Sequence, residues 1–111
     1  MQIGESRDGQ TVILSPSGDW DVETSPEFSA LALRLAEAGS SRFAVDFRQV
    51  TFIDSSALAC LISLYKRVKP TRGGDVKLFG MRPELLVIFR QTRLDHVFGI
   101  AETYEQLAGT W

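Results

Sequence analysis

Residues 45–58, with the sequence VDFRQVTFIDSSAL, change their hydrophobic pattern midway and thereby decide the fold. Up to Ile53 the segment is rich in β-branched and aromatic residues, which favour a strand. From Ser55 onward apolar residues recur at helical spacing until Pro70 interrupts them. Asp54 lies between the two patterns and is the expected N-cap of the helix. The stretch therefore predicts a strand that leads directly into a helix.

A similar alternation extends through the rest of the chain. The expected strands cover residues 11–14, 42–47 with a continuation at 50–53, 75–79, and a short last strand at 97–100. Helices are expected over residues 26–38, 55–68, 83–89 and 103–107. Short connections between strands and helices favour parallel strand pairs with right-handed crossovers. The sequence predicts a small α/β domain with a mixed, mostly parallel sheet of four to five strands covered by helices.

Caps and breakers set the limits of several elements. Ser25 is the expected cap of the first helix, with Pro26 in the first helical position and Gly39 as its stop. Arg82 is a weak cap for the third helix. Pro16 cannot donate to a sheet ladder, so the first strand is expected to end or bend there, at an edge, a bulge or the sheet margin.

Length and composition exclude several classes of protein. A chain of 111 residues is long enough for one hydrophobic core, so we expect a single domain spanning residues 1–111. Hydrophobic residues make up 44% and charged residues 23%, which argues against disorder. Twelve Lys and Arg against fourteen Asp and Glu give a net charge of −2. With no basic stripe in the sequence to neutralise phosphates, direct binding of nucleic acid is not expected.

Metal, disulfide and membrane roles also lack support in the sequence. A single cysteine, Cys60, cannot form an internal disulfide, and a single histidine, His96, cannot assemble a zinc site, so both are expected to be structural and no cofactor is predicted. Residues 1–10 are too polar for a secretory signal. The longest apolar stretch, residues 57–64, is interrupted by Ser63 and is too short to span a membrane. We therefore expect a cytoplasmic protein without membrane insertion.

The start of the second helix carries the residues with chemical potential. Asp54 can accept hydrogen bonds from backbone amides of the first turn, while the hydroxyls of Ser55 and Ser56 can stay accessible to solvent. A phosphate added there would face unpaired amides and the positive end of the helix dipole. The same three residues are also typical of an ordinary helix cap, which is the simpler interpretation of the motif alone.

Three stretches resemble the STAS domain of bacterial anti-sigma factor antagonists. Residues 45–58 resemble the central signature of that family, an apolar strand followed by V-x-F-I/M-D-S-S/T-G-L and an amphipathic helix. Residues 17–21 match its G-E/D-L/W-D turn, and residues 72–78 through 94–98 resemble its G-G-x-L/V and L-x-x-V/L-F ending. The chain departs from the pattern at Ala57 and Ala59, where glycine is common in the family, and both residues remain small.

This resemblance implies a regulatory protein that is not an enzyme. By position, Ser55 corresponds to the serine that is phosphorylated by an anti-sigma factor with ATP-dependent serine kinase activity and dephosphorylated by a metal-dependent Ser/Thr phosphatase. The unphosphorylated protein is expected to bind the kinase and thereby free a sigma factor. The resemblance and the sequence around Ser55 place the partner-binding surface at Asp19, Trp20, Asp21, Asp54, Ser56, Ala57 and Leu58.

Two other classes of function compete with this interpretation. A STAS-domain regulatory subunit of a lipid or anion transport complex would also be a non-enzyme and would not be phosphorylated. A phosphoryl-accepting receiver would use Asp46 or Asp54, but the sequence lacks the acidic pair and the late lysine that such a protein needs. No Ser-His-Asp set is supported, because His96 stands in an apolar context that favours packing. Nothing in the pattern predicts an oligomeric state.

Overall fold

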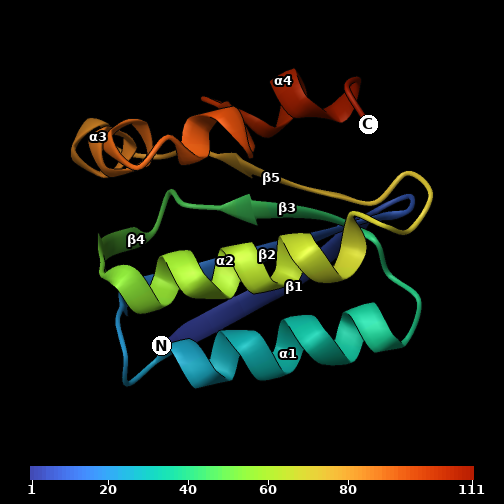
Figure 1. Ribbon diagram of the computed structural model, residues 1–111, viewed down its shortest axis with the longest axis horizontal. Helices are drawn as coiled ribbons and strands as arrows, with labels where there is room; N and C mark the ends of the chain where they lie inside the picture. Colours follow the sequence, from blue (N-terminus) through green and yellow to red (C-terminus); the bar gives the residue numbers. More distant parts are fainter.

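A six-stranded mixed sheet forms the centre of the computed structural model, which describes residues 1–111 (Figure 1). Its strands are β1 (Gln2–Asp8), β2 (Thr11–Trp20), β3 (Arg42–Asp46), β4 (Val50–Ile53), β5 (Asp75–Phe79) and β6 (Gly99–Ala101). The strand order is β1-β2-β3-β5-β6, and β4 pairs with the far end of β2. β1 is antiparallel to β2, and all other pairs are parallel.

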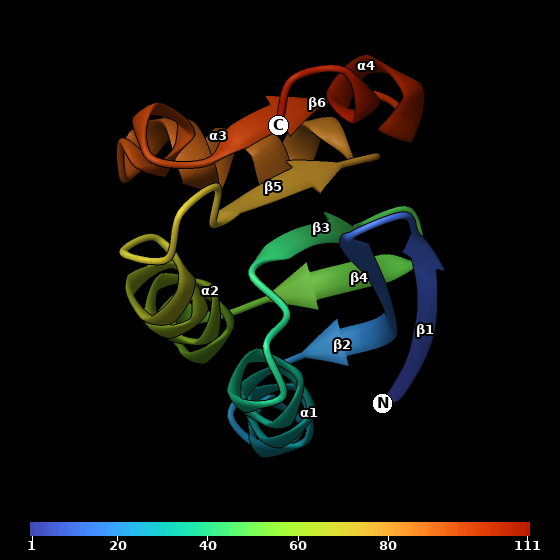
Figure 2. The same ribbon diagram turned by 90° about the vertical axis from the view of Figure 1, so that its right-hand side faces the viewer.

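Helices cover both faces of this sheet. α1 (Ser25–Glu37), α2 (Ser55–Val68) and α3 (Pro83–Gln91) lie on one face, and α4 (Tyr104–Ala108) lies on the other (Figure 2). A short 3-10 helix, Leu94–His96, joins α3 to β6. The larger apolar core lies under the first three helices, whereas a smaller cluster of Ala44, Phe79 and Leu107 packs beneath α4.

The predicted fold class is confirmed, with one more strand than the four to five expected. β1 escaped prediction because nearly all of its residues are exposed, so it has no apolar alternation to mark it as a strand. It lies at the edge of the sheet, where pairing with β2 holds it through backbone hydrogen bonds. The strand tolerates a polar sequence because side chains on both of its faces are exposed to solvent.

β2 continues past Pro16 to Trp20 instead of ending there. On one side β2 pairs with β3 up to Leu14 and with β4 from Gly18, so Pro16 falls in the interval between these two partners. The register with β4 also shifts between Gly18 and Asp19, as in a β-bulge. The proline therefore lies where β2 has no parallel partner, although it still pairs with Ile3 of β1 on the other side, and its missing N–H is tolerated there.

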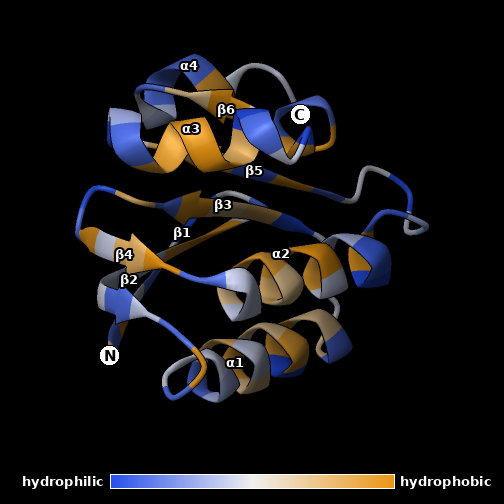
Figure 3. Ribbon diagram, turned by 60° about the vertical axis from the view of Figure 1, so that its left-hand side comes forward, coloured by the Kyte–Doolittle hydropathy of each residue, from blue (hydrophilic) through white to orange (hydrophobic).

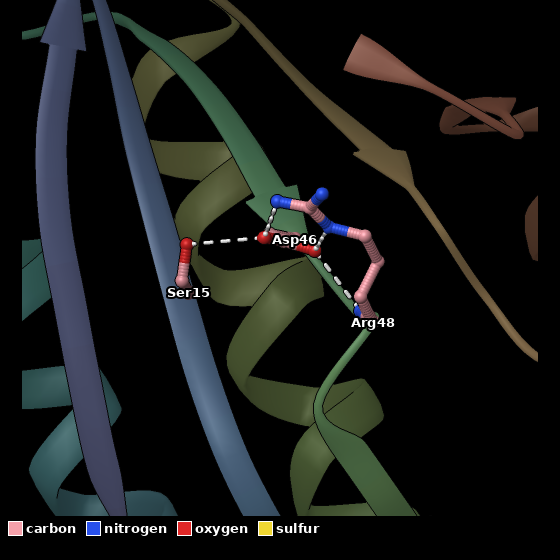
Figure 4. A network of polar contacts seen from close by, with 3 residues as sticks. All are labelled: Ser15, Asp46 and Arg48. Carbon is pink, nitrogen blue, oxygen red and sulfur yellow. Dashed lines mark hydrogen bonds and ion pairs between the residues drawn. The ribbon is translucent and has the colours of Figure 1, made fainter.

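A polar network fixes the turn from β3 to β4 (Figure 4). The Asp46 carboxylate accepts hydrogen bonds from the backbone N and the Nε of Arg48, both at 3.0 Å, and from its Nη2 at 2.8 Å. Ser15 Oγ on β2 donates to the same carboxylate at 3.3 Å. Only 7% of the Asp46 side chain is exposed, so these bonds compensate for the burial of its charge.

Replacing Asp46 with Asn is expected to lower the free energy of unfolding by about 1–2 kcal/mol at pH 7, because it removes hydrogen bonds to a charged group. Burial alone raises the pKa of Asp46, but the bonds and charge of Arg48 and the bond from Ser15 outweigh burial and leave the pKa below its ordinary value. The stabilisation is therefore complete above about pH 4 and is lost as the pH falls further through the folded-state pKa.

Urea unfolding at several pH values measures this difference. The difference in the free energy of unfolding between wild type and Asp46→Asn should become smaller below about pH 4, where wild-type Asp46 becomes protonated. Asp95→Asn is the matched control, because Asp95 is exposed and lies 3.9 Å from His96 in a weak ion pair. If this difference in the free energy of unfolding stayed constant down to the lowest pH measured, it would contradict the lowered pKa of Asp46.

Candidate functional site

Asp54 joins two separate segments of the chain at one end of the sheet. It follows β4 and caps α2: its Oδ1 accepts from Ser56 N at 2.9 Å and from the Ser56 hydroxyl. Its Oδ2 accepts from Val22 N at 3.1 Å, in the loop before α1. The backbone N of Asp54 donates to the carbonyl of Trp20 at 3.3 Å. The predicted cap is confirmed, and it also holds the loop before α1 against the start of α2.

These contacts keep Asp54 ionised. The hydrogen bond from the Ser56 hydroxyl is the largest influence and lowers the pKa of Asp54. Partial desolvation acts in the opposite direction, but the backbone N–H groups of Ser56, Val22 and Ala57 lower the pKa further. At neutral pH the site therefore carries a fixed negative charge beside Ser55.

The loop before α1 is shaped by a second acidic residue, Asp21. Its Oδ1 accepts from Glu23 N at 3.0 Å and Thr24 N at 3.2 Å, while Asp21 N donates to Thr24 Oγ1 at 3.0 Å. Thr24 is the N-cap residue of α1, so the helix begins one residue earlier than predicted and Ser25 is not its cap. Ser25 is buried instead and points toward α2.

Two adjacent serines begin α2, but their hydroxyls differ in environment. Ser56 Oγ donates to Asp54 and accepts from Ser25 Oγ of α1 at 2.9 Å, so its hydrogen-bonding capacity is used within the protein. Ser55 is exposed at the first position of α2, and its hydroxyl has no hydrogen-bond partner in the protein. Of the two, only the Ser55 oxygen is directed to solvent without a partner.

Two residues predicted to contact a partner lie beneath the surface instead. Trp20 is completely buried, with its ring 4.4 Å from that of Phe28 and 5.8 Å from that of Phe47. Ala57 is only 1% exposed. Leu58 is half-buried and packs against the core. Trp20 and Ala57 therefore support the site from below, because a partner on the surface cannot touch them without rearrangement.

The structure adds two apolar residues that the sequence pattern did not predict to be part of the site. Val22 is 70% exposed in the loop before α1, and Phe52 is 48% exposed on β4, whose ribbon Figure 3 shows in hydrophobic colours next to the start of α2. Phe52 pairs in register with Asp19 of β2. Val22 is an apolar residue among polar turn residues, and this pattern was a signal for an exposed contact residue. Phe52 lies among apolar strand residues, so its sequence context favoured burial.

We call the solvent-accessible residues at this end the Ser55 surface. It consists of Asp19, Asp21, Val22, Phe52, Asp54 and Ser55, and Ser56 lies half-buried at its margin. Ser55 is exposed at the start of α2 and lines none of the five best-defined hollows of the molecule, so we describe the site as an open surface. Acidic side chains surround exposed apolar ones there, which is typical of surfaces that bind other proteins.

Residues that could support other kinds of chemistry lie elsewhere in the molecule. His96 is exposed in the 3-10 helix, with 72% of its side chain accessible, so the expectation that it packs in an apolar environment is wrong. Cys60 is buried and forms no disulfide. No group of three or more His, Cys, Asp and Glu side chains is arranged to hold a metal ion. None of the helices has the length and hydrophobicity needed to cross a bilayer.

The fold and the site together define a small α/β domain that presents a serine on an open surface at the start of a helix. The sequence matches the model of the STAS domain over residues 5–107, and the chain therefore belongs to the STAS domain family. Comparison with curated protein sequences gives no significant match.

Solved structures share this fold at low sequence identity. A candidate anti-sigma factor antagonist from Thermotoga maritima superposes with a TM-score of 0.89 at 20% identity, covering 95% of this chain and 90% of that one. SpoIIAA from Bacillus in its phosphorylated form gives 0.75 at 17% identity, covering 96% of both chains, and its unphosphorylated form gives the same TM-score. A sulfate transporter family protein from Wolinella succinogenes gives 0.74 at 16% identity, covering 90% of this chain and 83% of that one.

Proposed function

We propose that this chain is an anti-sigma factor antagonist regulated by phosphorylation of Ser55. The observation that carries the proposal is the exposed, unpartnered hydroxyl of Ser55 within the Ser55 surface of a STAS domain. Structural neighbours described as anti-sigma factor antagonists, one of them solved in a phosphorylated form, support the same function. The chain performs no catalysis in this scheme and acts by binding.

In the unphosphorylated state the Ser55 surface binds an anti-sigma factor that is also a serine kinase, and a sigma factor is released. Val22 and Phe52 supply apolar contacts, and the surrounding carboxylates favour a basic partner surface. The buried ring of Trp20 packs on Phe28 of α1, and its backbone carbonyl accepts a hydrogen bond from Asp54 N, so Trp20 links the loop before α1 to the start of α2.

Phosphorylation reverses the binding. Ser55 Oγ attacks the γ-phosphorus of ATP held by the kinase; the new O–P bond forms as the bond to the ADP oxygen breaks, and the hydroxyl proton is lost to the kinase or solvent. The product carries about −1.5 to −2 charge beside Asp54 and near Asp21. A metal-dependent Ser/Thr phosphatase hydrolyses the ester and restores the binding form.

The test is incubation of the purified protein with ATP and the anti-sigma factor kinases of the source organism, followed by mass spectrometry. Phosphate is expected on Ser55 and not on Ser56, because the Ser56 oxygen is engaged by Asp54 and Ser25. Ser55→Ala should remain unmodified, whereas Ser63→Ala, which removes another exposed serine of α2, should be modified like the wild type. Phosphate on Ser56 or on Ser55→Ala would contradict the assignment.

A second candidate function is a STAS regulatory subunit of a lipid or anion transport complex, with binding that does not depend on phosphorylation. The likeness to the sulfate transporter family protein favours this alternative. Copurification with a membrane transport complex, together with no phosphate on Ser55 in the presence of any kinase tested, would support it against the first proposal.

A further inference from the structure

Acidic and basic residues are separated along α1, α2 and the segments next to them. Residues 9–33 contain Asp19, Asp21, Glu23 and Glu27 but no Lys or Arg. Residues 55–74 contain Lys66, Arg67, Lys69 and Arg72 but no Asp or Glu. α1 and α2 lie side by side and run in the same direction, so the acids gather at their N-terminal ends and the bases at their C-terminal ends (Figure 1).

At the acidic end, Asp54 joins Asp19 at the end of β2, Asp21 and Glu23 of the following loop, and Glu27 in the first turn of α1. None of these five takes part in an ion pair within the chain. Their hydrogen-bond partners are backbone N–H groups and hydroxyls, so the negative charge is not neutralised. The acidic end contains most of the Ser55 surface.

The basic end collects side chains from four different segments. Arg34 lies in the last turn of α1 and Lys66 and Arg67 in that of α2. Arg42 begins β3 and reaches the loop after α2, where its Nη2 lies 3.3 Å from the Cβ position that a side chain at Gly73 would occupy. Lys69 and Arg72 line a hollow of about 380 Å³ in that loop.

The basic end keeps most of its charge. Lys69 is the only one of these six side chains in an ion pair, with Asp75 at 3.5 Å, and Glu37 adds one further carboxylate nearby. α2 has 14 residues and separates the two ends by about 20 Å, which exceeds the screening length of about 8–10 Å at physiological salt. The two ends therefore do not neutralise each other within one molecule.

We infer that the basic end of one copy docks on the acidic end of a second copy. The charge complementarity is present in the chain itself: arginine side chains can bind carboxylates through two parallel hydrogen bonds, and the acidic end presents five carboxylates. The apolar side chains of Val22 and Phe52 lie among those carboxylates and would be covered by the contact. Such a contact is heterologous, because the two copies use different surfaces, so repeated docking builds chains unless the rotation between copies closes a ring.

Self-docking would cover Ser55 in every copy except the one at the end of a chain. If the proposed function holds, self-docking competes with the anti-sigma factor for the same surface. The inference itself requires neither a kinase nor phosphorylation. It can therefore fail while Ser55 is phosphorylated as proposed, and it can hold when Ser55 is not phosphorylated.

Sedimentation velocity of the unmodified full chain tests the inference. At 20 mM NaCl and about 0.5 mM protein, the weight-average mass is expected to rise at least about 1.5-fold above the monomer, and at 0.5 M NaCl it should return to the monomer because salt screens the contact. Arg67→Glu/Arg72→Glu at the basic end and Glu23→Lys/Glu27→Lys at the acidic end should each be monomeric at low salt.

Mixing the basic-end variant with the acidic-end variant tests whether opposite ends of two copies dock on each other. The basic-end variant retains a native acidic end and the acidic-end variant retains a native basic end, so their mixture should associate although neither variant associates alone. Arg90→Glu/Arg93→Asp is the charge-matched control on α3 and the turn after it, and it should associate like the wild type; Asp suits the positive φ of Arg93. Circular dichroism establishes that each variant is folded.

A monomeric wild type at low salt would overturn the inference, as would association that survives in the basic-end variant. Binding to vesicles of phosphatidylglycerol is a second measurement. If wild type binds them, the basic-end variant does not, and wild type stays monomeric without vesicles, the basic end serves an anionic lipid surface and the self-docking inference is wrong.

Discussion

Ser55→Asp is expected to weaken binding to the anti-sigma factor kinase by about 100-fold, which corresponds to about 2.7 kcal/mol. The new carboxylate lies beside Asp54 and on the same surface as Asp21. Two like charges 4 Å apart repel by about 1 kcal/mol in water and about 4 kcal/mol at an effective dielectric constant of 20. The partner must also desolvate the added charge when it docks. Isothermal titration calorimetry with the purified kinase measures the change.

The melting temperature of Ser55→Asp should change little, because Ser55 is exposed at a helix N-terminus where a negative charge is favourable. Ser63→Asp is the matched control: it introduces the same charge at an exposed serine two turns further along α2 and should bind like the wild type. Equal loss of affinity in both variants would show that net charge matters and position 55 does not. A large loss of stability in Ser55→Asp would instead indicate a structural serine.

Trp20→Ala is expected to have the largest effect on stability, a loss of about 3–5 kcal/mol in the free energy of unfolding. The indole is fully buried and contacts the rings of Phe28 of α1 and Phe47 after β3, so the truncation leaves a cavity beside these two rings in the main core. The backbone of Trp20 also accepts the hydrogen bond from Asp54 N, and loosening of this residue should disturb the Ser55 surface. Urea unfolding followed by circular dichroism measures the loss.

Trp20→Phe separates ring packing from the role of the indole nitrogen. Trp20 Nε1 is buried without a hydrogen-bond partner, so a phenyl ring loses no bond and removes a polar group that is costly to bury. We expect Trp20→Phe to lose less than half as much stability as Trp20→Ala. If Trp20→Ala lost less than about 1 kcal/mol, the indole could not be the packed core residue that the structure shows.

Local patterns in the sequence were sufficient for the order of the helices and of four strands, with residues 50–53 expected as a continuation of the second, and the position of the candidate acceptor came from the resemblance to a family. The change of period at Asp54 identified the end of β4, the cap and the start of α2, because strand alternation, helical spacing and N-capping depend on residues close together in the chain. β1 could not be predicted in this way because an edge strand exposed along its length needs no apolar period.

Only the tertiary structure decided how the candidate site is built. It assigned different environments to two adjacent serines, because the partner of Ser56 is Ser25, 31 residues earlier in the chain. It buried Trp20 and left Phe52 exposed, although both are aromatic residues in strands. It also brought the acids of α1 and Asp54 to one end and the bases to the other.

The chain by itself therefore determined the class of fold and the cap at Asp54, since both follow from the chemistry of neighbouring residues, whereas Ser55 as the candidate acceptor came from the resemblance to a family. The packing of α1, α2 and the sheet against one another decides which side chains are exposed to solvent. It also decides which oxygens have no hydrogen-bond partner and where the charged residues lie. Those properties arise from contacts between residues distant in sequence, which no local periodicity encodes.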